Sequence, residues 1–385
     1  MSNKCKEDLE YFLRFVETKR DDNELNHIDF YFLHTREELN KFIKIYLEKN
    51  NVNNKYDLIY MIKSIIKYMS GIHDFTSNIT DLSEKSLPFT LKFVENELYI
   101  DKCYDNMFNK AKIIGINGEN IGNLMLEMEK IIPYPTKEWL LKSLESGFCD
   151  KNMILSLPSI KNDNKMLVIN TNIGNLSIDL DHNYPFLIDN VDNYKVINNV
   201  LLYDGFKNVK NNEINYNDIE FLINNNKINS LILDLRDKSD INIDKLMILV
   251  DFLKKNNIEI YIYVNKGVSS NALKACFELK RNGCKLIGEE IGLPINQFDN
   301  KNDKGLTPNY KLNIILPTNY VYLDNSSNKI ANISAKKELY CLPKDTFVER
   351  FIEIDEYLPY KEDDFLQDTD PILFFAKNLS KNHRL

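Results

Sequence analysis

Long apolar stretches are absent from this chain. The opening residues, "MSNKCKEDLEYFLRFVE", hold no apolar core of signal-peptide length. No later stretch reaches about 18 uncharged apolar residues, the length that can span a bilayer. These absences predict a soluble protein that is not exported, with a cytoplasmic location and no membrane partner.

Cysteine is scarce and shows no metal-binding pattern. The six cysteines form no C-x-x-C pair, so we expect reduced thiols and no disulfide framework or zinc site. Four of the five histidines also share no metal-ligand spacing. They are His27, His34, His182 and His383. The sequence therefore predicts neither a metal nor a cofactor.

Blocks of basic residues are missing as well. The net charge is -8, and no run of Lys and Arg exceeds a few residues, which argues against nucleic acid as a partner. The composition, 43% hydrophobic and 28% charged, is that of a globular protein. A chain of 385 residues is long enough for two or three domains.

Residues 1–82 are predicted to form a helical region. Three stretches carry apolar residues at three- and four-residue spacing, which is typical of amphipathic helices. In the second of these, Thr35 stands three residues before Glu38, the spacing of a capping box.

Residues 83–135 are predicted to form mainly short strands. "FTLKFVENELYI" predicts a hairpin that turns at Glu95 and Asn96, and "AKIIGINGENIGNLMLEMEKII" predicts a strand, an Asn-Gly turn and a helix. A connecting segment, 136–165, leads to the last and largest part.

This last part, residues 136–385 with the connecting segment included, has the clearest pattern. Short apolar strands alternate with amphipathic helices over 230–290: "SLILDL", "INIDKLMILVDFLKKN", "IEIYIYV", "NALKACFELKRN" and "CKLIGEE". This order predicts an α/β domain with a parallel sheet. Ligands of such sheets bind beyond the carboxyl ends of the strands, where the loops 236–242 and 265–271 would lie.

The second of these loops contains paired serines, Ser269 and Ser270, where a helix should begin. A serine at this position commonly caps the helix by accepting hydrogen bonds from its first N–H groups. A serine on a strand-to-helix turn can also be a nucleophile, because its hydroxyl is exposed beside backbone donors. From the residues alone, both interpretations stay open.

The order of these motifs resembles the tail-specific (C-terminal-processing) serine peptidases, with the tricorn protease core and the retinoid-binding-protein modules among their relatives. Three groups of motifs carry the resemblance along most of the chain. They are "LILDLRDKSDIN", "YIYVNKGVSSNA" and "KLIGEE" in the last part; "SGIHDFTS", "LPFTLKFVENELYI" and "AKIIGINGENI" upstream; and "YDGF" with the terminal-helix-like "DDFLQDTDPILFFAKNL". The resemblance implies a multidomain α/β protein with an N-terminal helical region, a PDZ-like module over 83–135 and a crotonase-like domain.

The resemblance also implies a serine-type peptidase that acts on peptides or protein C-terminal regions. The nucleophile position falls on Ser270 when counted from Val264, or on Ser269 when counted back from Gly288; the upstream count favours Ser270. The Ser-Lys branch of the family is excluded, because Pro294 stands where its lysine would be. The tricorn-like branch takes a histidine base from the helical region, which corresponds to His73.

The oxyanion hole is where this chain departs most from the family. The backbone N–H of Asn271 would supply one donor, and the loop at Ser239 and Asp240 would supply the other. Family members have glycines there, whereas this chain has Ser239, Asp240 and Ile241. The resemblance therefore leaves two alternatives, a divergent peptidase or a catalytically impaired peptide-binding protein.

Overall fold

The computed structural model consists of two compact units, each assembled from segments that are distant in the sequence. The first comprises Met1–Pro135, Leu140–Leu187 and Asn296–Val348, and the second comprises Thr136–Trp139, Ile188–Ile295 and Glu349–Leu385. The structure describes residues 1–21, 34–70, 78–81, 86–160, 165–184, 194–204, 216–324, 326–327, 329–333 and 350–382. The chain is a multidomain protein of mixed helices and several sheets, as predicted. The finer three-part division at residues 82 and 135 stays a prediction.

The three helices predicted near the N-terminus are present in the first unit. They are α1 (Asn3–Asp21), α2 (Arg36–Lys49) and α3 (Lys55–Ser70). The capping box is confirmed, because the Thr35 hydroxyl accepts from the Glu38 N–H and the Glu38 carboxylate accepts from the Thr35 N–H at 2.8 Å. This cap explains why α2 begins at Arg36.

A long hairpin from much later in the sequence completes the core of these helices. Its sheet contains β1 (Asn78–Thr80), β13 (Gln297–Leu306), β14 (Asn313–Asp324) and β15 (Lys329–Ile333). Leu312, Ile314 and Leu316 pack with the buried side chains of the helices. Residues some 250 positions apart therefore share one hydrophobic core, which the sequence pattern did not predict.

The predicted middle hairpins form in the same unit. The elements are β2 (Phe89–Val94), β3 (Glu97–Cys103), a 3-10 turn (Asn106–Phe108), β4 (Ile113–Ile116), β5 (Glu119–Asn120), α4 (Ile121–Glu129), α5 (Lys137–Gly147), α6 (Lys151–Ser156), β6 (Met166–Thr171) and β7 (Gly174–Asp179). The first hairpin turns at Glu95 and Asn96, and the next at Asn117 and Gly118, all four with positive φ. Strands β6 and β7 join β4 and β5 in one sheet.

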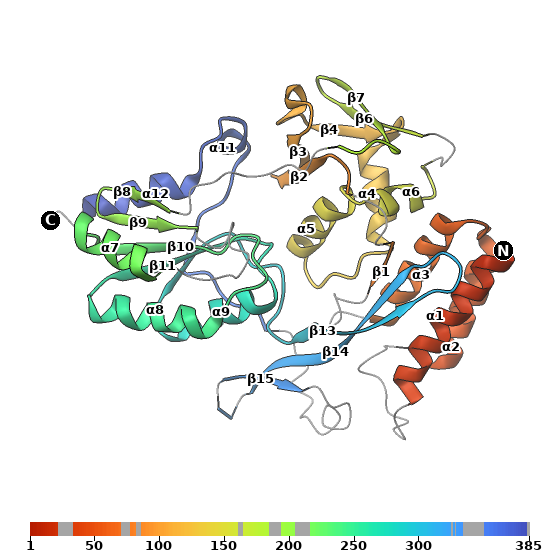
Figure 1. Cartoon of the computed structure of the whole chain (residues 1–385). Coiled ribbons are helices and arrows are strands. Elements are labelled where there is room, and N and C mark those ends of the chain that lie inside the picture. The colour runs from red at the N-terminus through yellow and green to blue at the C-terminus, as the bar shows by residue number, and fades with distance from the viewer. Residues whose placement is uncertain are drawn as a thin grey trace. The chain divides into compact units, whose positions relative to one another are not determined.

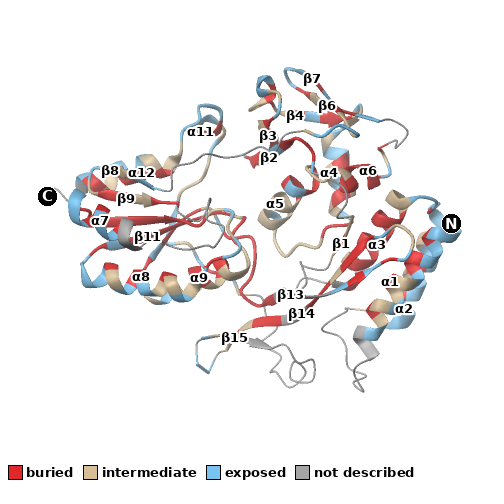
Figure 2. Cartoon of the chain, in the orientation of Figure 1, coloured by how far each residue is buried: buried red, intermediate tan, exposed pale blue. Residues whose placement is uncertain are grey.

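The second unit is built on a six-stranded sheet of order β16-β12-β11-β10-β9-β8. Its strands are β8 (Tyr194–Ile197), β9 (Val200–Tyr203), β10 (Ser230–Asp234), β11 (Glu259–Val264), β12 (Lys285–Gly288) and β16 (Glu356–Tyr357). All neighbours pair in parallel except β8 and β9. The predicted parallel order of β10, β11 and β12 is confirmed, and Figure 2 shows the central strands as buried.

Helices cover this sheet on both faces. The helices of this unit are α7 (Tyr216–Asn226), α8 (Ile243–Lys255), α9 (Ser270–Arg281), α11 (Glu362–Leu366) and α12 (Pro371–Asn382). Helix α12 packs on Ile232, Tyr261 and Ile287 of the sheet, and Figure 1 shows α8 and α9 on the other side of the strands. The segment 363–379, predicted as one terminal helix, forms two, because a proline fits the first turn of a helix and Pro371 starts α12.

The described cysteines are free thiols, as predicted. Cys5, Cys103, Cys149, Cys276 and Cys284 form no disulfide, and Cys341 lies outside the described residues. Burial raises the pKa of the Cys276 thiol to about 12, so this group is an inert part of the core. None of the helices in the described ranges is both long and apolar enough to cross a membrane.

Candidate functional site

The paired serines lie at the carboxyl edge of the parallel sheet. Strand β11 ends at Val264, a five-residue loop follows, and α9 begins at Ser270. The neighbouring strand β10 ends at Asp234, in register with Tyr263. The two loops in which ligand binding was predicted therefore follow adjacent strands.

A network of hydrogen bonds holds these two loops together. The buried side chain of Asn265 accepts from the N–H groups of Asp237 at 3.0 Å and Gly267 at 3.1 Å. Further on, the Ser269 N–H donates to the Lys238 carbonyl at 3.0 Å. The sequence carries no functional signal at Asn265, because an Asn-Lys-Gly stretch after a strand is typical of an ordinary turn.

The backbone of Ser270 has an unusual conformation. Its φ is 49°, in the left-handed region that residues other than glycine rarely adopt. Ser269, the N-cap residue of α9, is extended, with φ -148° and ψ 172°, and its hydroxyl makes no capping hydrogen bond. The capping interpretation therefore does not describe Ser269, and Ser270 occupies a strained turn between strand and helix of the kind found at nucleophiles.

Relief of this strain gives a measurable prediction. Glycine adopts positive φ without steric cost, so Ser270→Gly should unfold with a free energy about 1 kcal/mol higher than Ser270→Ala. The Ser270→Ala variant keeps the strain and should stay close to the wild type. Urea denaturation of both variants measures the difference.

The matched control is Ser269→Gly. Because Ser269 is extended, glycine relieves nothing there and should destabilise by about 0.5 kcal/mol through unfolded-chain entropy. Equal stability of Ser270→Gly and Ser270→Ala would show that the turn is not strained.

Of the predicted oxyanion-hole residues, Asn271 lies at the start of α9, and Ser239 and Asp240 lie in the loop that contacts this helix start. The N–H groups of Ser239, Asp240 and Asn271 donate to no other residue in the described part of the chain. The Asn271 N–H follows directly after Ser270, where a donor for an oxyanion is required. These N–H groups are the donors that the site can offer.

The loop 238–240 also presents oxygen acceptors to the same helix start. The Ser239 carbonyl accepts from the Ala272 N–H at 3.2 Å, and the Asp240 carboxylate faces the Asn271 side-chain amide at 3.5 Å. Asp240 is exposed, so water screens its charge. An oxyanion formed at Ser270 would still have this carboxylate close to the same helix start.

The base predicted from the sequence is His73. His73 lies outside the described residues, and its role stays a prediction. Two other histidines are described: His34 stacks on Tyr68 with ring centroids 3.8 Å apart, and His182 packs edge-on against Tyr184. Within the described ranges, no group of three or more His, Cys, Asp or Glu side chains could hold a metal ion.

An ion pair between Asp234 and Arg236 follows the end of β10 and has additional partners. The Arg236 guanidinium donates to Asp234 at 2.6 Å and to Asp370 at 2.7 Å, and lies 4.1 Å from the centre of the Tyr263 ring. Burial alone lowers the pKa of Arg236, but the nearby carboxylates outweigh this effect and hold its pKa well above its usual value. Through these contacts, Arg236 connects the end of β10 to β11 and to the start of α12.

The similarity of this chain to known proteins is confined to solved structures. No family model and no curated protein matches the sequence. A photosystem II D1 C-terminal processing protease aligns over 93% of this chain and 94% of its own, at 8% identity and a TM-score of 0.39. The tricorn protease aligns over 93% of this chain and 36% of its own, at 12% identity and a TM-score of 0.35.

A lipoprotein from Streptococcus agalactiae aligns over a smaller part. It covers 48% of this chain and 69% of its own, at 15% identity and a TM-score of 0.27. Similarities at these identities and TM-scores carry no functional conclusion, so we base the function on the geometry of the serine loop.

Proposed function

We propose that this chain is a serine-type peptidase with Ser270 as its nucleophile. The observation that carries the proposal is the positive φ of Ser270 on a strand-to-helix turn at the carboxyl edge of a parallel sheet. The unengaged Asn271 N–H beside it supports the same role. Ser269, with an extended backbone, is the less suitable of the two serines.

The chemistry assigned to these residues is acyl transfer. The Ser270 oxygen attacks the carbonyl carbon of a peptide bond while His73 accepts its proton, and the Asn271 N–H donates to the oxyanion. His73 then protonates the leaving amine as the C–N bond breaks. His73 next takes a proton from water as the water oxygen attacks the acyl-enzyme, and it passes this proton to the Ser270 oxygen as the ester bond breaks and the carboxylic acid leaves.

The proposal includes the domain types implied by the sequence resemblance. The six-stranded unit would be the crotonase-like domain, and the segment around β2 to α4 the PDZ-like module. Such a module can hold a peptide as an added strand along an exposed sheet edge. The substrates would be peptides or protein C-terminal regions in the cytoplasm.

A second candidate function is peptide binding without catalysis. It is favoured by the loop 238–240, where the Ser239 carbonyl and the Asp240 carboxylate face the start of α9. Loss of one oxyanion donor lowers turnover by about 100-fold to 1,000-fold. A protein with this loop in place would bind peptides and turn them over slowly or not at all.

A fluorophosphonate probe, which reacts with activated serines, separates the two candidates. We expect the wild type and Ser269→Ala to be labelled, and Ser270→Ala and His73→Ala to remain unlabelled, as measured by intact-protein mass spectrometry. Circular dichroism of each variant controls for folding. An unlabelled but folded wild type would exclude the peptidase and leave the binding protein.

A further inference from the structure

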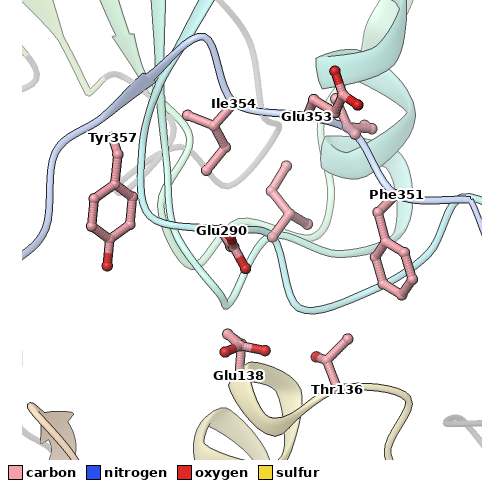
Figure 3. A pocket seen from close by; sticks show the side chains of 9 residues that line it. Thr136, Glu138, Glu290, Phe351, Glu353, Ile354 and Tyr357 are labelled. Atoms are coloured by element: carbon pink, nitrogen blue, oxygen red, sulfur yellow. The ribbon is translucent and has the colours of Figure 1, made fainter.

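A pocket of about 560 Å³ lies in the second unit, beside the sheet edge that carries the serine loop. Its volume falls within the range of about 300–1,000 Å³ found for small-molecule sites. Figure 3 shows the nine side chains that line it. They are Thr136, Glu138, Glu290, Ile291, Phe351, Ile352, Glu353, Ile354 and Tyr357.

Strand pairing places this pocket next to the serine loop. Gly288, the last residue of β12, pairs with Val264, the last residue of β11, and the Glu289 N–H donates to the Val264 carbonyl at 3.1 Å. The pocket begins at Glu290, one residue further on, whereas the serine loop begins directly after Val264. Both features therefore follow the carboxyl ends of adjacent strands.

The segment 136–139 closes one side of the pocket through contacts with Gly292. The Thr136 hydroxyl donates to the Gly292 carbonyl at 2.7 Å and accepts from the Trp139 N–H at 3.1 Å. A Cβ atom on Gly292 would lie only 2.7 Å from the Trp139 nitrogen. Glycine at this position permits the close approach that brings Glu138 to the pocket.

Two carboxylates face each other across this space. Figure 3 shows Glu138 and Glu290 extending from opposite walls into the pocket. Neither side chain forms an ion pair with a residue of the described chain. Like charges repel each other, so a cation placed between these two carboxylates would be stabilised.

Aromatic and aliphatic side chains form the rest of the walls. Phe351 is 42% exposed and Tyr357 65% exposed, although both are large and apolar. Burial and the nearby charges of Glu289, Glu290 and Glu138 raise the pKa of the Tyr357 hydroxyl. The Tyr357 side chain therefore stays neutral beside these carboxylates. A ligand side chain with an aliphatic stem and a cationic end could place the stem against the rings and the cation beside the carboxylates.

We propose that this pocket binds the basic side chain, lysine or arginine, of a peptide held at the serine loop. The inference rests on the proposed function, whose substrate class it narrows to peptides with a basic residue. Two opposed carboxylates accept several N–H donors from one ammonium or guanidinium group, and the adjacent rings contact its stem.

The test compares two peptides on the full chain carrying Ser270→Ala, which cannot cleave them. Acetyl-Ala-Ala-Lys-Ala-Ala-amide and its norleucine counterpart differ only in the ammonium group. We expect the lysine peptide to bind about 10-fold more tightly in calorimetry, because hydrogen bonds to charged groups contribute about 1.5–3 kcal/mol. In Glu138→Gln/Glu290→Gln this preference should fall below about 2-fold.

Glu356→Gln is the matched control, because Glu356 is an exposed carboxylate of β16 that does not line the pocket. It should keep the preference for lysine. Equal binding of both peptides, or a preference that survives Glu138→Gln/Glu290→Gln, would overturn the inference. Tighter binding of free cadaverine than of the lysine peptide would also overturn it, since the ligand would then be a free amine.

The two proposals fail in different ways. Binding does not require the Ser270 hydroxyl, so a folded wild type that resists the fluorophosphonate but prefers lysine would refute only the catalysis. Labelling of Ser270 without a preference for lysine would refute only the basic-side-chain pocket.

Discussion

Replacing Arg236 with alanine is expected to lower the free energy of unfolding by about 3–5 kcal/mol, because it leaves a buried carboxylate unpaired. Asp234 has a side chain only 5% exposed, and Arg236 is its cationic partner at 2.6 Å. Asp370, 30% exposed, would lose the same partner but could be hydrated. Urea denaturation followed by circular dichroism measures the change.

Arg281→Ala is the matched control for this prediction. Arg281 pairs with Glu278 one turn earlier on α9, at 3.2 Å, and both side chains are about a third exposed. A pair of this kind is worth about 0.3–0.5 kcal/mol. If Arg236→Ala cost no more than Arg281→Ala, the network would not contribute to the stability of the sheet edge.

Gly288→Ala should destabilise the second unit by about 2–4 kcal/mol, through a backbone clash and a strained φ. Gly288 has φ 127°, and a Cβ atom there would lie 2.1 Å from the Val264 carbonyl oxygen. This clash is with backbone, so β11 and β12 must separate. The melting temperature measured by circular dichroism should fall accordingly.

Gly283→Ala separates the clash from the strain. Gly283 also has positive φ, 79°, but no atom of the described residues beyond its chain neighbours lies within 4 Å of its added Cβ. Its substitution should cost about 1 kcal/mol, the conformational term alone. Because Val264 leads into the serine loop, Gly288→Ala should also slow labelling of Ser270, and similar behaviour of the two variants would contradict the close approach.

Local patterns were sufficient to predict many elements of this fold. Thr35 and Glu38 are three residues apart, Glu95 and Asn96 sit in a tight turn, and each feature is decided by hydrogen bonds and φ preferences within a few residues. The alternation of strands and helices over 230–290 predicted the parallel order correctly, because short crossover connections permit few topologies. The sequence also placed the serines at the carboxyl edge of the sheet.

Other features depend on partners that lie far away in the chain. Leu312 and Ile314 enter the core of the N-terminal helices, and β16 joins β12 from about 70 residues later. Apolar periodicity shows that a face will be buried but does not identify the face that covers it. The predicted terminal helix is divided before Pro371. Proline is a local signal for a helix start, but the apolar spacing on both sides of it suggested one continuous helix.

The sequence by itself therefore determined the class of the second unit and the position of Ser269 and Ser270 at its edge. Only the tertiary structure decided that Ser270 takes the strained φ, that the Ser239 carbonyl faces α9, and that Glu138 and Glu290 converge on one pocket. The physical reason is that strand order follows from local hydrogen bonding and chain length, whereas a backbone angle at a turn and the meeting of two carboxylates follow from packing between distant segments.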